Sequence, residues 1–135
     1  MITLTNTLQV EGNIMDYPKT VSDMLKLTHV PVVMIDQESI FTYVNGAFET
    51  EYGWTEEELL GKPVSEIMPV HMRSGHYVGF ARFLTTESTN LLGKPLPLKV
   101  CYKDGREALS NHYILGEKTE GRWRFSAIID YPDKR

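Results

Sequence analysis

The sequence predicts a single α+β domain in which one antiparallel sheet is covered by helices, and three observations predict it. Two short runs rich in β-branched and aromatic residues, 32–36 and 40–45, are separated by a polar stretch, as in a hairpin. Several short helical segments and one longer helix follow between residues 46 and 85. The last third alternates between apolar and polar residues in three segments, which predicts a three-stranded meander. Helices and strands that are segregated along a chain in this way bury a single sheet face.

Composition limits the function classes. A chain of 135 residues fits one domain, and a net charge of -4 leaves no basic excess for binding nucleic acid. The apolar runs are too short to insert into a membrane, and the N-terminus lacks the layout of a secretory signal, so a cytoplasmic protein is expected. The single cysteine, Cys101, rules out an internal disulfide and a cysteine-based zinc site.

The N-terminal region divides into an arm and a helix. Residues 1–18 are polar and aperiodic, which predicts a flexible arm before a domain at 19–131 and a tail at 132–135. From Thr20, the residues Val21, Met24, Leu25 and Thr28 recur at helical spacing and predict a short amphipathic helix. Its apolar side could cover the open face of the sheet, pair with a second copy, or do both, and a homodimer through this helix and the sheet face is expected.

The central helices include one with a histidine on its apolar side. Residues 46–53, 55–60 and 65–68 predict short helices, the second with a capping box formed by Thr55 and Glu58. A longer helix is predicted at 70–85. Its apolar stripe comprises Met72, His76, Phe80 and Phe83.

The last three strands are predicted at 96–102, 108–115 and 123–130. Asp104-Gly105 supplies the first turn, and a loop through Gly116 and Gly121 joins the last two strands. Alternation places Cys101 opposite the inward residues of its strand, and it places Trp123 and Phe125 in the core.

This order of elements, and the residues that fill it, resemble the PAS family over residues 20–131. The most specific matches are Asn45 at the end of the second strand, Phe48, the Gly53-Trp54 pair and the run 60–63. The resemblance implies a PAS fold: a five-stranded antiparallel sheet, helices packed on one face and an N-terminal amphipathic helix. It also implies a sensory domain in signal transduction.

The segment Arg73-Ser74-Gly75-His76, followed by Arg82 and Gly93, looks like the haem-binding PAS domains of oxygen-sensing kinases and phosphodiesterases. In those proteins the histidine at the position of His76 is the proximal iron ligand, so haem is the leading specific candidate. The chain departs from them near 94–96, where they carry a distal arginine or methionine. It also places His112 at a position that is apolar in the family.

Simpler interpretations compete with haem. We prefer His76 as a core histidine satisfied by a carbonyl or carboxylate, and His112 as a strand histidine paired with a neighbour rather than a second iron ligand. The light-sensing cysteine motif of flavin-binding relatives is absent, so Cys101 is expected to pack without chemistry. Flavin held noncovalently through Ser110 or Asn111 is a weaker alternative.

The sequence therefore predicts a sensor rather than an enzyme, since no nucleophile with its base, paired carboxylates or phosphate loop is found. A ligand would occupy a cavity between the long helix and the sheet and signal to a partner or output domain, which we expect outside these residues. The alternative is a ligand-free interaction module. The predicted cavity contacts are Met72, His76, Phe80, Leu84, Leu91, Leu96, His112 and Ile114.

Overall fold

A computed structural model describes residues 7–10 and 13–130 of the chain. Its centre is a five-stranded antiparallel sheet in the order β4-β3-β7-β6-β5. The strands are β3 (Val32–Asp36), β4 (Phe41–Val44), β5 (Leu96–Cys101), β6 (Glu107–Thr119) and β7 (Arg122–Asp130). The predicted α+β fold and its sheet are confirmed.

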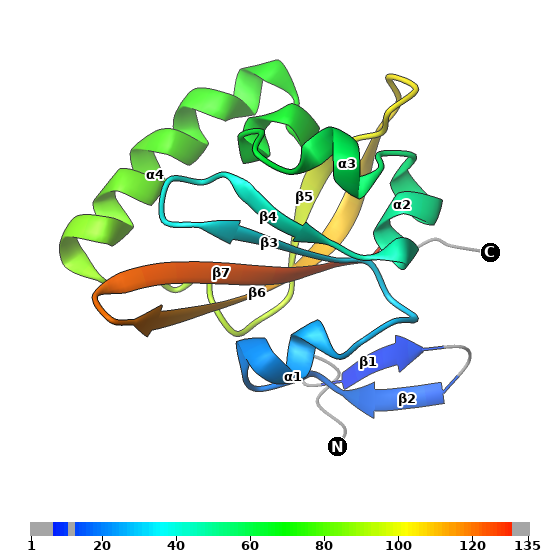
Figure 1. The fold of residues 1–135 in the computed structure, drawn as a ribbon, viewed down its shortest axis with the longest axis horizontal. Helices are drawn as coiled ribbons and strands as arrows, with labels where there is room; N and C mark the ends of the chain where they lie inside the picture. Colours follow the sequence, from blue (N-terminus) through cyan, green and yellow to red (C-terminus); the bar gives the residue numbers. More distant parts are fainter. Residues whose placement is uncertain (1–6, 11–12, 131–135) are drawn as a thin grey trace.

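Helices lie on both faces of the sheet, as Figure 1 shows. Most of them pack on one side, here called the inner face, and α1 lies on the other, the outer face. The helices are α1 (Val21–Leu25), α2 (Gly46–Tyr52), α3 (Glu56–Leu59), η2 (Val64–Ile67), η3 (Val70–Met72) and α4 (Arg73–Thr86). The capping box predicted for α3 is present, with Thr55 Oγ1 accepting from the Glu58 amide and Glu58 Oε1 accepting from the Thr55 amide.

The predicted long helix is divided in two. A 3₁₀ turn, η3, precedes α4, which begins at Arg73. The predicted apolar stripe is real but only partly covered: Phe83 is buried, whereas His76 and Phe80 are half-buried. A stretch of the apolar stripe of α4 therefore remains near the surface.

The β6–β7 hairpin is longer than predicted. Instead of forming a loop, Gly116 lies inside β6, and the turn is made by Glu120 and Gly121 with φ of 52° and 81°. Two consecutive residues with positive φ suit the twist of a tight hairpin. Gly116 suits this position, because an added Cβ would lie 3.0 Å from the ring of Phe125, closer than an ordinary contact. Sequence reasoning mistook this packing glycine for a loop signal.

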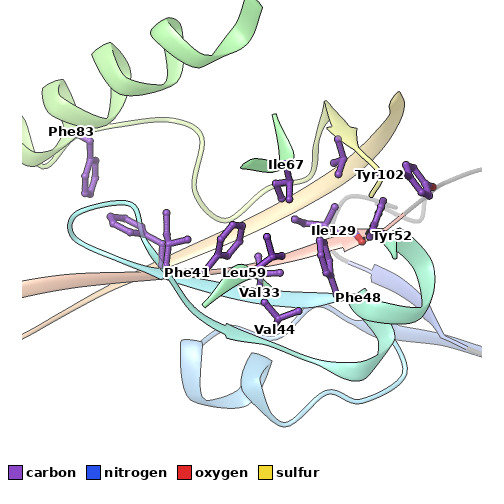
Figure 2. Close-up of a cluster of buried hydrophobic side chains, with 13 residues drawn as sticks. Val33, Phe41, Val44, Phe48, Tyr52, Leu59, Ile67, Phe83, Tyr102 and Ile129 are labelled. Carbon is purple, nitrogen blue, oxygen red and sulfur yellow. Dashed lines mark hydrogen bonds between the residues drawn. The ribbon is translucent and has the colours of Figure 1, made fainter. Parts of the chain in front are cut away.

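The inner face holds the main core. Figure 2 shows Phe83 reaching this core from α4 and Ile67 from η2. At the other end, the rings of Tyr52 and Tyr102 lie 4.8 Å apart, and the Tyr52 hydroxyl donates to Ser110 Oγ over 2.8 Å. The predicted core positions Trp123 and Phe125 are confirmed, since Phe125 is buried and Trp123 packs against it.

Helix α1 covers the outer face of its own sheet. Val21 and Met24 are 2% and 0% exposed, and Met24 packs in a cluster with Val32 and Ile128. Of the two roles predicted for this helix, the structure has the first. Its apolar side is therefore not exposed for pairing with a second copy, although Thr28, predicted on the same side, is exposed.

The segment predicted as an arm contains an antiparallel hairpin, β1 (Thr7–Val10) with β2 (Asn13–Asp16). Downstream, the ring of Tyr17 stacks on Tyr113 with centroids 4.2 Å apart, and the Tyr113 hydroxyl donates to the Pro18 carbonyl over 2.9 Å. Sequence reasoning found neither the hairpin nor this contact. The flexibility of the arm stays a prediction, and the predicted tail at 132–135 lies outside the described residues.

Candidate functional site

A cavity of about 130 Å³ lies between the inner face of the sheet and the segment from η2 to α4. Its size is close to that of an engineered cavity of about 150 Å³ that binds benzene. The lining is mainly apolar and comes from both layers. It comprises Val33, Ile35, Val64, Ile67, Met68, Met72, His76, Leu98, Lys99, Val100, His112, Ile114, Phe125, Ser126, Ala127 and Ile129.

Half of the residues predicted to contact a ligand line this cavity. Met72, His76, His112 and Ile114 line it. The other four lie elsewhere. Phe80 and Leu84 pack against the inner core, Leu96 pairs with His112 across the strands, and Leu91 is 50% exposed.

The residue that faces inward in the segment after α4 is Leu92, one position after the predicted Leu91. Helix α4 ends at Glu87, which has a φ of 55°, and the following segment turns Leu91 outward. Leu92 packs against the inner core instead, with its Cδ1 atom 3.3 Å from the position of a Cβ added to Gly116. A connecting segment without regular structure has no period from which its inward residue could be read.

His76 is held by a serine that sequence reasoning did not single out. Its Nε2 atom lies 2.9 Å from Ser39 Oγ, and its ring lies 5.5 Å from that of Phe80. Burial lowers the pKa of His76 because the charged imidazolium would lose its hydration. This arrangement agrees with the core-histidine interpretation, with a hydroxyl in place of the expected carbonyl or carboxylate.

Ser39 is itself rigidly placed. It is 1% exposed, its φ is 68°, its amide donates to the Asp36 carbonyl, and its own carbonyl accepts from the Val64 amide. A side chain with positive φ is uncommon outside glycine and asparagine, so the surrounding turn imposes this conformation. No local signal links Ser39 to a histidine 37 residues later.

His112 presents an unused acceptor. Its Nδ1 atom lies 3.0 Å from the carbonyl oxygen of Ser110, and since a carbonyl only accepts, Nδ1 carries the proton. Burial lowers the pKa of His112 to about 4, so the ring is neutral at pH 7. Nε2 is then a lone-pair acceptor at the distal end of the ring. Within residues 13–130 no group donates to it.

Among the described residues, no charged side chain projects into the cavity. Lys99 contributes to the lining, but its side chain is exposed and alternates with the inward residues Leu98 and Val100. Asn111 alternates with His112 and so lies on the outer face, and the Ser110 hydroxyl is engaged by Tyr52. Neither donor proposed for flavin is therefore available in the cavity.

The residues do not fit haem in this conformation. Pockets for drug-sized ligands measure about 300 to 1,000 Å³, which exceeds the 130 Å³ found here, and haem is larger than most such ligands. The Nε2 atom of His76 is also engaged by Ser39. Apart from haem, whose iron can be held by one protein ligand, the described residues contain no cluster of three or more histidine, cysteine or acidic side chains that could hold a metal ion.

A second, larger hollow of about 350 Å³ opens to solvent and is lined by Glu51, Tyr102, Arg106, Glu107 and Ala108. Three of its polar side chains already have partners. The Tyr102 hydroxyl donates to Glu51, and Arg106 lies over the Tyr102 ring and pairs with Asp104. The cavity between the two layers is mainly apolar and has an unused acceptor, so it is the better candidate site.

Comparison with known proteins identifies the family. The family model described as the PAS fold matches residues 20–109. The chain belongs to the PAS family. Its members are sensory and regulatory modules that typically act in signal transduction, bind small ligands, often dimerise and are generally not catalytic.

Among PAS proteins, the sensor protein FixL of Bradyrhizobium diazoefficiens is 27% identical over 113 residues, which cover 84% of this chain and 22% of FixL. An uncharacterized protein of Azorhizobium caulinodans is 27% identical over 107 residues, 78% of this chain and 15% of that protein. The chain thus spans less than a quarter of the length of these relatives.

Solved PAS domains share the fold. One from Desulfitobacterium hafniense has a TM-score of 0.64 at 21% identity and covers 81% of this chain and 98% of that domain. The PAS domain of the quorum-sensing receptor RpfR from Cronobacter turicensis, in complex with C12:0, has a TM-score of 0.57 at 16% identity and covers 78% and 97%. Within the described part of this PAS domain, no helix combines the length and apolarity needed to cross a bilayer.

Proposed function

We propose that this PAS domain is a sensor whose apolar cavity binds a small molecule and whose sheet transmits the binding event to a partner or output domain. The observation that carries the proposal is the cavity itself, apolar in lining and bordered by two neutral imidazoles, His76 and His112. An apolar pocket with a few convergent polar groups is the usual form of a ligand site.

Haem is not part of this proposal. An iron-ligand role for His76 would require α4 to move away from the sheet and the contact between His76 and Ser39 to break. In the proposal, Met72, His76 and Ile114 form the cavity wall, and His112 supplies a polar contact. The relationship to FixL supports a sensory role at the level of the family.

Strand β6 offers a route for the signal. His112 lines the cavity on the inner face, while its neighbour Tyr113 lies on the outer face, stacked on Tyr17 and bonded to the Pro18 carbonyl. A ligand that displaces His112 would also displace Tyr113, because consecutive strand residues share one backbone. In this proposal the contact between Tyr113 and Tyr17 differs between the free and bound states, which is how a ligand shifts an equilibrium.

Titration of the ¹⁵N-labelled protein with uncharged compounds of about benzene size tests the proposal. We expect amide shifts at Leu98, Ile114 and Phe125 around the cavity, and smaller ones near Tyr17. Filling the cavity with Ala127→Leu should abolish the shifts, since Ala127 lies on the inner face and lines the cavity. Ala81→Leu, the same change at an exposed position of α4, is the matched control and should leave them unchanged.

A failure of every compound to shift the cavity residues would refute ligand binding. The domain would then be a ligand-free interaction module, the alternative that the sequence left open. A homodimer through α1 would require Val21 and Met24 to leave the sheet, because both are buried there. Dimerisation itself stays a prediction, which sedimentation of the purified domain would test.

A further inference from the structure

The cavity between the two layers is bordered by a hydrogen-bond acceptor, His112 Nε2, for which no donor is found among the described residues. His112 is 9% exposed, and its Nδ1–H is committed to the Ser110 carbonyl, so the ring cannot offer a donor from its other nitrogen while it is neutral. The Nε2 atom of His76 is committed to Ser39. Among the described residues no donor reaches His112 Nε2, so this atom is open to a donor from a ligand.

Charge and size restrict what that donor can belong to. Lys99, the one charged residue of the cavity lining, has an exposed side chain, so an ionised ligand would lose its hydration without gaining a counter-charge. A volume of about 130 Å³ accommodates a molecule of the size of benzene. The aromatic rings and aliphatic side chains of the lining favour an apolar body.

We infer that His112 is the specificity-determining residue of this cavity and that it selects uncharged, largely apolar ligands with about six to eight non-hydrogen atoms and one hydroxyl group, which donates to His112 Nε2. The inference rests on the proposed function, because it names the ligand class of the same cavity. Neutrality of the ring at pH 7, which follows from its burial, keeps Nε2 available as an acceptor.

Phenol and toluene form a matched pair of probes, because a methyl group replaces the hydroxyl on the same ring. We would measure the dissociation constants of both by NMR titration in the wild type and in His112→Leu, which removes the acceptor and keeps an apolar side chain. The ratio of phenol affinity to toluene affinity should fall about tenfold in the variant, the scale of one buried hydrogen bond. Because the affinity ratio of the two probes is compared between the variant and the wild type, the unequal hydration of phenol and toluene cancels.

Two further measurements test the role of His112 even if the His112→Leu variant does not fold. Ile114→Val trims the same wall without touching the acceptor, and its affinity ratio should equal that of the wild type. In the wild type, the ¹⁵N spectrum of the imidazole should show Nδ1 protonated and Nε2 bare. The Nε2 resonance should move on addition of phenol and stay in place with toluene.

The outcomes separate the two proposals. If both probes shift the cavity residues but the affinity ratio is unchanged in His112→Leu, or the Nε2 resonance does not respond to phenol, the role of His112 is wrong and the ligand-binding function stands. If neither probe shifts the cavity residues, both proposals are wrong. A falling ratio together with a responding Nε2 resonance supports both.

Discussion

Asn45 should be the most important polar side chain for the stability of this domain. Its Oδ1 atom accepts from the amides of Val32 and Phe48, both over 3.0 Å. Its Nδ2 atom donates to the carbonyls of Leu27 and Val30 over 3.2 and 2.9 Å. One buried side chain therefore caps α2 and also anchors the connection between α1 and β3.

Replacing Asn45 with alanine removes all four hydrogen bonds. Loss of a helix N-cap costs about 1 kcal/mol, and each of the other three bonds contributes about 1 kcal/mol when the partner is left unsatisfied. We therefore expect Asn45→Ala to lower the free energy of unfolding by about 4 kcal/mol, a large share of the roughly 5 to 15 kcal/mol typical of a domain. Urea unfolding followed by the fluorescence of Trp54 and Trp123 measures it.

The same chain provides the control. Thr55 caps α3 but is exposed, and its Oγ1 atom accepts one backbone bond, from Glu58, so Thr55→Ala should cost only about 1 kcal/mol. Asn45→Ser, which keeps an N-cap and lacks the amide donors, should fall between the two. If Asn45→Ala is no more destabilising than Thr55→Ala, the count of hydrogen bonds is a wrong guide to the energetics of this site.

Three further predictions concern buried polar groups and haem. The Ser126 hydroxyl is buried without a hydrogen-bond partner among the described residues, so Ser126→Ala should raise the free energy of unfolding by about 1 kcal/mol. A lower free energy of unfolding, measured by urea titration, would contradict this. His112 has a pKa of about 4 in the folded state against 6.5 in the unfolded state, so between these pH values only the unfolded chain takes up the proton. The free energy of unfolding should therefore be constant above pH 6.5 and fall by about 3 kcal/mol as the pH drops to 4. In His112→Leu this pH dependence should disappear. Titration with haemin should give no stoichiometric Soret band, and a band that His76→Ala removes would show that α4 opens to admit haem.

Local signals in the sequence determined the elements. A run rich in β-branched residues marked β3 at Val32–Asp36, the Thr55 and Glu58 pair marked the start of α3, and Asp104-Gly105 marked a turn. These features depend on neighbours a few residues apart, whose backbone preferences and hydrogen bonds act within one turn or strand. The same local periods placed Met72, His76, His112 and Ile114 on the sides that face the cavity.

Only the tertiary structure decided what those residues do. The sequence allowed α1 to cover the sheet, to pair with a second copy, or to do both, and burial of Met24 against Val32 and Ile128 shows that it covers the sheet. Nothing local joins Ser39 to His76, and no pattern along the chain gives the volume of a cavity. A cavity is the small space left where two packed layers fail to meet, so it depends on every side chain that lines it and on none of them alone.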